Sequence, residues 1–399
     1  MEKCYIIFFI LTLSLGSIQC SEKMPTYSEY MEENHAILEK MDEQLNFENL
    51  FEDELESNEI FFSSEEHAVS VNKKIEIQLL RYFVRNANVK YLLIEHSYAQ
   101  SMKYNEYLKT GNDKILKECL DELQGTLSYT KQFYNYWKEV YKLNQQLEEK
   151  DRIWVVGIDL GWPATGINYL NKQLINTNLD QLPLLKDLLS GYGQDFEDEQ
   201  KVKFYKTVLI ELKKIHILDK TQLFETTYII NNFIRSIEAF SLGYGLETHQ
   251  KRDQYIYENF LELTKRLPKG KFFGQWGLNH VYQSDQLEVN WLGRLLNNNE
   301  DSPVKGKVLS IATFYNDCER IKWRAKDAEI LNSFQPNIDT LKINVTTNTA
   351  YLFRLNEPYS PFKRELLWFG AYTPDSGVTT DFFEYMIVAN KYKASDVYQ

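Results

Sequence analysis

Along this chain, short and nearly continuous apolar runs alternate with longer stretches in which apolar residues recur at helical spacing. Apolar runs of four to eight residues are typical of buried strands. The run over 153–159 is apolar almost throughout, which predicts a strand covered on both faces. The predicted strands are Glu59–Ser63, Lys90–Glu95, Ile153–Asp159, Lys271–Gly277, Lys307–Phe314, Thr340–Val345, Ala350–Leu355 and Phe383–Ala389.

Helical spacing fills the segments between these runs. It predicts three helices: one over 71–84, one that follows the second strand and continues through Tyr107, and one over 113–148. Gly111-Asn112 breaks the chain between the last two. From about 166 to 265 the pattern is helical with no convincing strand. The order of strands and helices predicts an α/β fold: a central mostly parallel or mixed sheet flanked by helices, with a helical insertion at 166–265.

The first residues resemble an export signal. Residues 1–20 combine a basic start at Lys3, an apolar run over 7–15 and a small or polar end. That run is short for a membrane span, although an uncleaved N-terminal anchor is the alternative. Cys20, the last residue of this segment, is a lipidation candidate, and lipidation would tie the exported protein to a membrane. We expect a signal peptide at 1–20, a solvated acidic leader at 21–58 and one α/β domain at 59–399.

Composition narrows the class of protein. The chain has 399 residues, of which 43% are hydrophobic and 26% charged, as in soluble globular proteins. Its net charge of −12 argues against a nucleic-acid partner, which would require clustered Lys and Arg. Cys119 and Cys318 lack the spacing of a zinc or redox motif, so they are either a disulfide or two buried thiols.

Polar side chains follow the predicted strands at their carboxyl ends. Glu65 and His67 follow the first strand, Glu95 ends the second, Asp159 ends the third, and His280 comes just after the fourth. Ligands of open α/β sheets bind outside the carboxyl ends of the strands. A single histidine in such a place is more often structural, but two histidines and a carboxylate together predict a site.

Glu95 carries most weight in this prediction. A carboxyl group that closes an apolar strand is partly desolvated, which raises its pKa unless a partner offsets the effect. Such a group can act as a base or hold an imidazole in one tautomer, and the structural alternative is an ion-paired carboxylate. His96 alternates to the opposite face of the strand and ranks below His67 and His280, and Glu66 is expected to point away from Glu65.

A metal site is the alternative for the same groups. His67, Glu95 and His280 form a plausible ligand set for a divalent cation, although no HExxH or HxH spacing supports it. The chain has no GxSxG nucleophile elbow, no P-loop and no GxGxxG, so a serine hydrolase of the usual α/β type is not expected.

Several motifs in order resemble the erythromycin esterase-like family, part of a wider group with ChaN-like haem- or iron-binding lipoproteins and TIKI-like metalloproteases. The resemblance spans most of residues 60–390. The motifs are Ser64-Glu-Glu-His67, Tyr91-Leu-Leu-Ile-Glu95, Asn105-Glu-Tyr-Leu, Val156-Gly-Ile-Asp159, Arg252-Asp-Gln, Gly274-Gln-Trp-Gly-Leu-Asn-His280 and Asp381-Phe-Phe-Glu-Tyr-Met-Ile-Val.

The resemblance implies roles for individual residues. His67 resembles the family's general base on water, Glu95 the carboxylate that places the water or the imidazole, and His280 the histidine that polarises the carbonyl or oxyanion. Glu65 resembles the acidic residue of the strand–turn motif. Asp159 and Arg252 would support these groups, and Lys73 or Arg252 would supply a stabilising cation.

The resulting expectation is an exported hydrolase of an ester or related acyl bond in a small-molecule substrate, without a cofactor. The first alternative is a surface lipoprotein that binds a divalent metal or haem iron. The second is a family member without catalytic activity.

Overall fold

A computed structural model describes residues 24–38, 48–51, 54–322, 327–336, 347–370 and 372–398. An eight-stranded sheet runs through it in the order β1-β9-β10-β6-β2-β5-β3-β4. The six strands from β10 to β4 are parallel, and β9 is antiparallel to both of its neighbours. The sheet strands are β1 (His35–Ile37), β2 (Ile60–Glu65), β3 (Val89–Ser97), β4 (Trp154–Asp159), β5 (Lys271–Gly277), β6 (Val308–Asn316), β9 (Thr349–Arg354) and β10 (Tyr385–Asn390).

The central strands are buried on both faces, and their side chains alternate between two cores. Phe61, Leu92 and Val155 face one hydrophobic cluster. Phe62 and Leu93 face the other. This alternation explains why the strands appear in the sequence as continuous apolar runs. The predicted α/β class and mostly parallel sheet are confirmed; the strand predicted at 340–345 lies outside the described residues.

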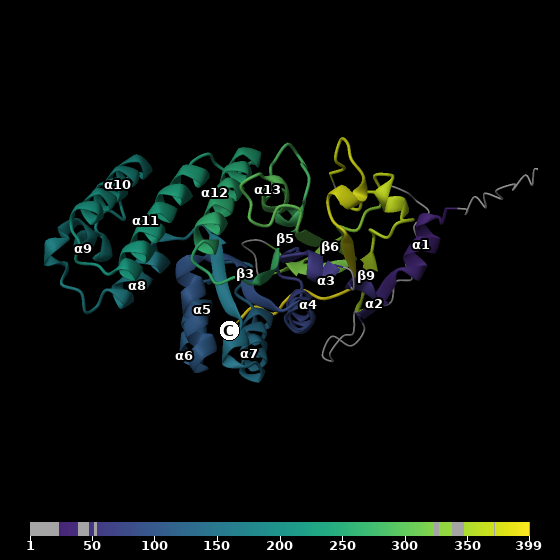
Figure 1. The fold of residues 1–399 in the computed structure, drawn as a ribbon, viewed down its shortest axis with the longest axis horizontal. Helices are drawn as coiled ribbons and strands as arrows, with labels where there is room; N and C mark the ends of the chain where they lie inside the picture. The colour runs from purple at the N-terminus through teal and green to yellow at the C-terminus, as the bar shows by residue number, and fades with distance from the viewer. Residues whose placement is uncertain are drawn as a thin grey trace, which may run out of the picture.

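Helices cover both faces of the sheet (Figure 1). One layer holds α4 (Asn72–Asn86), α5 (Tyr98–Thr110), α6 (Asp113–Asp121) and α7 (Lys131–Gln146). On the other face, α12 (Leu246–Thr264) and α13 (Leu292–Asn298) pack on the second cluster. Short 3₁₀ turns occur at Glu149–Asp151, Leu179–Gln181, Leu278–Val281, Pro361–Lys363 and Thr379–Asp381.

The segment between β4 and β5 is entirely helical, as predicted. It contains α8 (Pro163–Gln173), α9 (Pro183–Leu189), α10 (Asp198–Lys214) and α11 (Lys220–Phe240), followed by α12. The first four of these helices share their own hydrophobic cluster, which includes Leu170, Leu185, Val208 and Phe233. The insertion therefore builds a helical lobe beside the β4 edge of the sheet (Figure 1).

One local prediction differs from the structure and another is confirmed. The helix predicted over 113–148 is two helices, because the chain turns after α6, with Gly125 at φ 86°, and Thr130 caps a new helix by accepting from the Phe133 N–H. The break predicted at Gly111 is present, since Gly111 ends α5 in the left-handed conformation at φ 66°.

The expected solvated leader is also only partly solvated. In its described part, α1 (Tyr27–Glu33) buries Tyr30 and Met31, and β1 pairs with β9 at the sheet edge. Two short helices, α2 (Glu48–Phe51) and α3 (Glu54–Ser57), precede β2. A separate hairpin pairs β7 (Cys318–Ile321) with β8 (Ala328–Leu331). The predicted signal segment and Cys20 lie outside the described residues.

Cys119 and Cys318 are both buried free thiols. No helix in the described ranges is long and apolar enough to cross a membrane.

Candidate active site

Four neighbouring parallel strands, in the order β2-β5-β3-β4, bring the expected residues to one edge of the sheet. Glu65 is the last residue of β2, Asp159 the last of β4, and Glu95 lies two residues before the end of β3. His280 lies in the 3₁₀ turn directly after β5. Because all four strands are parallel, their carboxyl ends meet at this edge.

Arg252, on α12, connects three of these groups. Its guanidinium donates to both carboxylate oxygens of Asp159, at 3.1 and 2.6 Å, and to Glu95 Oε1 at 2.8 Å. A third nitrogen, Nη1, lies 3.1 Å from His280 Nε2. The Arg252, Glu95 and Asp159 side chains are 15%, 17% and 13% exposed, so this charged cluster is largely withdrawn from water but still reaches it.

Asp253, the next residue on α12, holds His280. Its Oδ2 lies 2.9 Å from His280 Nδ1 and also accepts the Leu292 N–H at 2.8 Å. Because a carboxylate can only accept, His280 carries its proton on Nδ1 whenever it is neutral, and Nε2 then accepts from Arg252. Burial lowers the pKa of His280, but the charges of Asp253 and Glu95 outweigh it and raise that pKa above the ordinary value.

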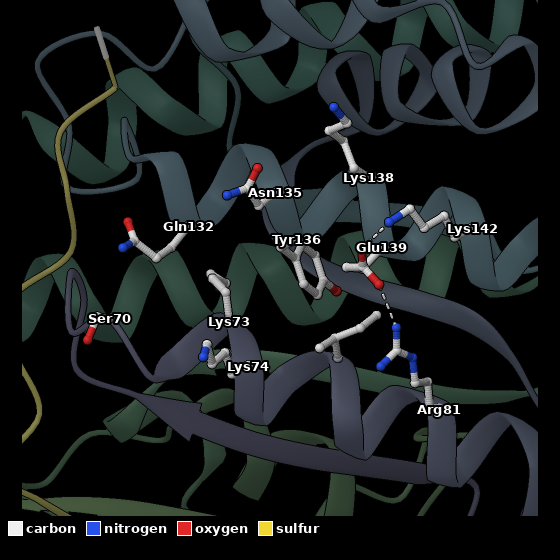
Figure 2. Close-up of a pocket in the computed structure, with 11 residues that line it drawn as sticks. Ser70, Lys73, Lys74, Arg81, Gln132, Asn135, Tyr136, Lys138, Glu139 and Lys142 are labelled. Atoms are coloured by element: carbon white, nitrogen blue, oxygen red, sulfur yellow. Dashed lines mark hydrogen bonds and ion pairs between the residues drawn. The ribbon is translucent and has the colours of Figure 1, made fainter. Parts of the chain in front are cut away.

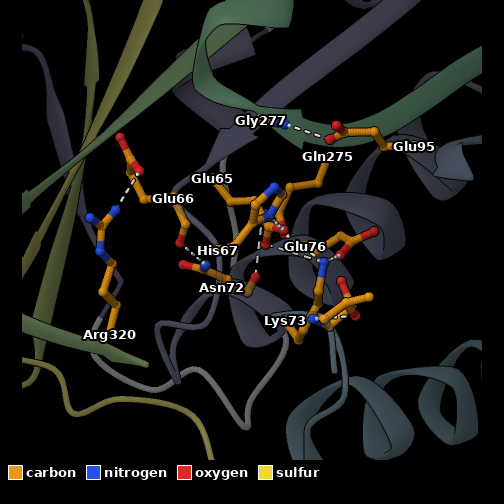
Figure 3. Close-up of polar contacts among 12 residues, drawn as sticks. Glu65, Glu66, His67, Asn72, Lys73, Glu76, Glu95, Gln275, Gly277 and Arg320 are labelled. Carbon is orange, nitrogen blue, oxygen red and sulfur yellow. Dashed lines mark hydrogen bonds and ion pairs between the residues drawn. The ribbon is translucent and has the colours of Figure 1, made fainter. Parts of the chain in front are cut away.

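Glu95 is a charged acceptor and not a base. Burial would raise its pKa, as the sequence suggested, but His280, Arg252 and His67 outweigh burial and hold the pKa well below the ordinary value. Its Oε2 also accepts the Gly277 N–H at 3.0 Å (Figure 3). The carboxylate is therefore fixed from two sides and suited to orienting other groups.

A second histidine–carboxylate pair lies at the end of β2. His67 Nδ1 is 2.9 Å from Glu65 Oε1, and Lys73 Nζ is 3.2 Å from Glu65 Oε2. Lys73 also donates to Glu76 at 2.7 Å and to Gln275 at 3.3 Å (Figure 3). Burial alone would raise the pKa of Glu65, but Lys73 and His67 lower it to about 2.

His67 is the most accessible member of the site, with 41% of its side chain exposed. Burial lowers its pKa, but the hydrogen bond to Glu65 and the charges of Glu65 and Glu95 prevail and raise it to about 9. Within the part of the chain that the structure describes, Nε2 of this ring has no hydrogen-bond partner. His67 is thus a histidine with one nitrogen anchored and the other available to a ligand.

Neighbouring residues that could compete for these roles point elsewhere. Glu66 turns away from Glu65 and pairs with Arg320 at 3.2 Å (Figure 3). His96 lies against the rings of Tyr104 and Phe133 on the opposite face of the sheet. Burial lowers its pKa to about 4, so it stays neutral at ordinary pH.

The alternative ligand set of His67, Glu95 and His280 does not fit a metal ion or haem iron. The Arg252 guanidinium contacts Glu95 and His280 Nε2, the atoms that a cation would need. In the described segments, no group of three or more His, Cys, Asp or Glu side chains is placed to hold a metal. A resident cation, Arg252, already supplies the positive charge at this point.

Two pockets lie beside the site, towards the helical lobe. The first is small, about 10 Å³, and Asp159, Trp162 and Phe233 are among its lining residues. Trp162 and Phe233 also line a second cavity of about 400 Å³ between α8, α10 and α11. Trp162 is 65% exposed, and its ring stacks on Phe240 with the centroids 5.8 Å apart. Exposed stacked aromatics are suited to contacts with an apolar ligand.

Three solved structures share this architecture. A Bacillus cereus protein superposes with a TM-score of 0.67 at 18% identity, covering 94% of this chain and 98% of that chain. A histidine-to-asparagine mutant of the erythromycin esterase EreC, in its open conformation, gives 0.66 at 14% identity over 91% and 98%. The chain has the fold of an erythromycin esterase.

A succinoglycan biosynthesis protein gives a TM-score of 0.65 at 13% identity, covering 93% of this chain and 98% of that chain. No protein-family model matches the chain, and no curated protein matches it. At these identities the likeness shows a shared fold, and the chemistry of this chain has to be argued from its own residues.

Asp253 is the residue of the candidate site that the sequence analysis did not single out. It is fully buried on α12, next to Arg252, and its Oδ1 has no hydrogen-bond partner in the described segments. Its position directly after Arg252, in the quoted Arg252-Asp-Gln motif, was the available signal. An acid beside a predicted cationic residue on an amphipathic helix resembles an ordinary surface pair until the tertiary contact with His280 is known.

Proposed function

We propose that this chain is a hydrolase of an ester or related acyl bond, in which His67 activates a water molecule. The observation that carries the proposal is the pair of carboxylate-anchored histidines at one sheet edge. His67 is held by Glu65 and His280 by Asp253, and the Arg252–Glu95 pair joins the second of them. A histidine with one nitrogen fixed by a carboxylate and the other open is the usual arrangement of a general base.

In the proposed step, neutral His67 accepts a proton at Nε2 from a water whose oxygen attacks the carbonyl carbon. The tetrahedral oxyanion forms near Arg252 and His280, and it collapses by expelling the alcohol, which takes the proton back from His67. A general base contributes about 10²–10⁴-fold to such a rate, and one oxyanion-stabilising group about 10²–10³-fold.

The charge state of His67 gives this mechanism a pH signature. Since the pKa of His67 is raised to about 9, the free enzyme at pH 7 holds the ring mostly in its protonated form. Only the neutral ring can accept the proton, so kcat/KM rises with pH, reaches half of its maximum near pH 9 and levels off about one pH unit above that.

An apolar acyl or alcohol group would have a place to bind. The cavity of about 400 Å³ offers apolar and aromatic surface at Trp162, Phe233 and Phe240. Trp162 also shares a smaller pocket with Asp159 of the charged cluster. Erythromycin belongs among the compounds to test, because one structural neighbour is an erythromycin esterase. Export guided by residues 1–20, with Cys20 as an anchor point, remains part of the proposal.

The experiment is a hydrolysis screen over aryl and alkyl esters of increasing chain length, lactones and erythromycin, between pH 7 and 10. Wild-type protein is compared with His67→Gln and His280→Gln, each checked by circular dichroism for folding. Hydrolysis that rises towards pH 9 and is lost in folded His67→Gln supports the proposal. Equal hydrolysis by wild type and folded His67→Gln contradicts it.

A further inference from the structure

The chain after β10 runs back along the turn that carries His67. Residues 393–398 (the strap) pass this turn and reach the start of α7 (Figure 1). Two backbone hydrogen bonds join the strap to the turn, from the Ser70 N–H to Lys393 O at 3.0 Å and from the Ser395 N–H to Ala68 O at 2.9 Å. The backbone directly after His67 is therefore held by a segment that is distant in sequence.

Ala68, the residue after His67, has a conformation that alanine rarely adopts. Its φ is 66°, in the left-handed region, where the Cβ of an L-residue crowds the following carbonyl oxygen. Such a conformation persists only when the surrounding structure fixes it. Ala68 is buried and its carbonyl accepts from Ser395, so the strap is placed to hold the left-handed turn.

The backbone before His67 is fixed without the strap. The Glu66 N–H donates to the Tyr315 hydroxyl at 3.2 Å, and Glu66 O accepts from the Asn72 amide at 2.7 Å. His67 therefore lies between two supports, and its Nδ1 is 2.9 Å from Glu65 Oε1. The direction of the ring towards Glu65 depends on both supports.

The strap is itself anchored to regular elements on both sides. Before it, the Glu319 N–H of β7 donates to Tyr392 O at 2.8 Å. Beyond the turn, Gln132 of α7 and Asp396 exchange two hydrogen bonds, at 2.9 and 3.0 Å. Figure 2 shows Ser70 and Gln132 beside this segment, which is drawn as a yellow ribbon. The strap is thus a fixed support for the turn.

Ser395 also brings the strap to the polar groups of the site. It is buried, and it lines a small pocket together with Glu65, His67 and Lys73. The strap therefore contacts the backbone of the turn and also borders the histidine–carboxylate pair.

We propose that the strap positions the His67 ring, by holding Ala68 in its left-handed conformation and so keeping His67 Nδ1 on Glu65. The strap is a positioning element, since it contributes no group to the reaction. The inference rests on the proposed function for the role of His67 as the base. The position of the ring can be measured without a substrate, so the two proposals can fail separately.

The test uses the full chain with Ser395→Pro, which removes the N–H that donates to Ala68 O. The matched control is Ala394→Pro in the same segment, because the Ala394 N–H has no acceptor in the described part of the chain. Circular dichroism checks that each variant folds.

The readout is the pKa of His67, which is about 9 in the wild type. Two-dimensional NMR of the histidine rings, assigned with His67→Gln, measures it. In Ser395→Pro this pKa should fall by at least about one pH unit, because the ring loses its hydrogen bond to Glu65. The charges of Glu95 and Lys73, which also act on the ring, are unchanged. In the control the pKa should stay as in the wild type.

Two substitutions at Ala68 test whether the left-handed turn carries the effect. A branched side chain disfavours positive φ, so Ala68→Val should lower the pKa of His67 although the strap is unchanged. Glycine adopts positive φ freely, so Ala68→Gly alone should keep the wild-type pKa. Added to Ser395→Pro, Ala68→Gly should recover at least about half of the lost difference. A general loosening of the fold would not be repaired by a more flexible residue.

Hydrolysis at pH 10 reports the position of the ring, because the ring is then mostly neutral in all of these variants. We expect kcat to fall at least about tenfold in Ser395→Pro, since a misplaced catalytic group can cost about 10²-fold. It should stay within about twofold of the wild type in Ala394→Pro. The NMR changes without hydrolysis by the wild type would support the strap and contradict the proposed function.

Three results would overturn the proposal. The first is a folded Ser395→Pro protein with the wild-type pKa of His67, or an equal fall in Ala394→Pro. The second is the absence of recovery when Ala68→Gly is added. The third, which decides the matter if Ser395→Pro does not fold, is an equal pKa of His67 in folded Ala68→Val and Ala68→Gly.

Discussion

The link between Glu65 and His67 can be tested directly by removing the carboxylate charge with Glu65→Gln. In the wild type, the hydrogen bond and charge of Glu65 are the largest influences that raise the pKa of His67, to about 9. Without them, burial and the charge of Lys73 favour the neutral ring, and only Glu95 opposes them. We therefore expect the pKa of His67 to fall to the ordinary value of 6.5 or below.

The size of this change makes it easy to measure. At pH 7, a histidine with a pKa of about 9 is only about 1% neutral, whereas one with a pKa of about 6.5 is about three quarters neutral. Two-dimensional NMR of the histidine ring, titrated from pH 5 to 10 and assigned with His67→Gln, reports this value without any substrate. The matched control is Glu66→Gln, since Glu66 pairs with Arg320 and not with His67.

The same pair makes a signed contribution to stability. Because the folded-state pKa of His67 is raised, its contribution is fully present below pH 6.5 and is lost as pH rises through about 9. Glu65→Gln should remove this pH dependence, and Glu66→Gln should retain it. A His67 pKa near 6.5 in the wild type, or one that Glu65→Gln leaves unchanged, would refute the reasoning.

Three further predictions concern the other charged groups. Arg252→Met leaves the carboxylates of Glu95 and Asp159 without their cation and should lower the free energy of unfolding, measured with urea, by about 3–5 kcal/mol. Arg252→Lys should lower it by less. A decrease of less than about 1 kcal/mol for Arg252→Met would contradict the geometry. Burial raises the pKa of Glu384 to about 8, so the free energy of unfolding should fall as pH rises above 4.5. Glu384→Gln should abolish this fall between pH 4.5 and 6.5, below the range in which His67 contributes, and a slope that persists there would show that another group causes it. The metal content measured by mass spectrometry should stay well below one ion per chain, and chelators should leave hydrolysis unchanged. The reason is that Arg252 contacts His280 Nε2 and Glu95 Oε1, the atoms that a metal would need. Stoichiometric metal in the wild type that is lost in His280→Gln would contradict this prediction.

Local pattern was sufficient for the sheet and for the edge of it at which the candidate residues meet. The apolar runs that precede Glu65 and end at Glu95 and Asp159 are parallel strands of one sheet, and continuous apolar runs are stable only when both faces are covered. Parallel strands then bring their carboxyl ends together, so residues far apart in sequence could be placed at one edge without any contact information.

What the sequence did not reveal depends on contacts between distant segments. β1 has only three residues and gains its place by pairing with β9, more than 300 positions later. Asp253 is identified only by its contact with His280. Glu95 has a lowered pKa only because His280, Arg252 and His67 approach it from other elements. Periodicity reports which face of an element is apolar, and it carries no information about which charge meets which.

We propose above that His67 is the general base of a hydrolase. The most direct measurement is kcat/KM at pH 8 for the best ester found in the screen, compared between wild type, His67→Gln and His216→Gln, an exposed histidine outside the site. We predict that kcat/KM falls about 10²–10⁴-fold in folded His67→Gln and by no more than about twofold in His216→Gln. A folded His67→Gln protein that keeps wild-type kcat/KM would contradict it.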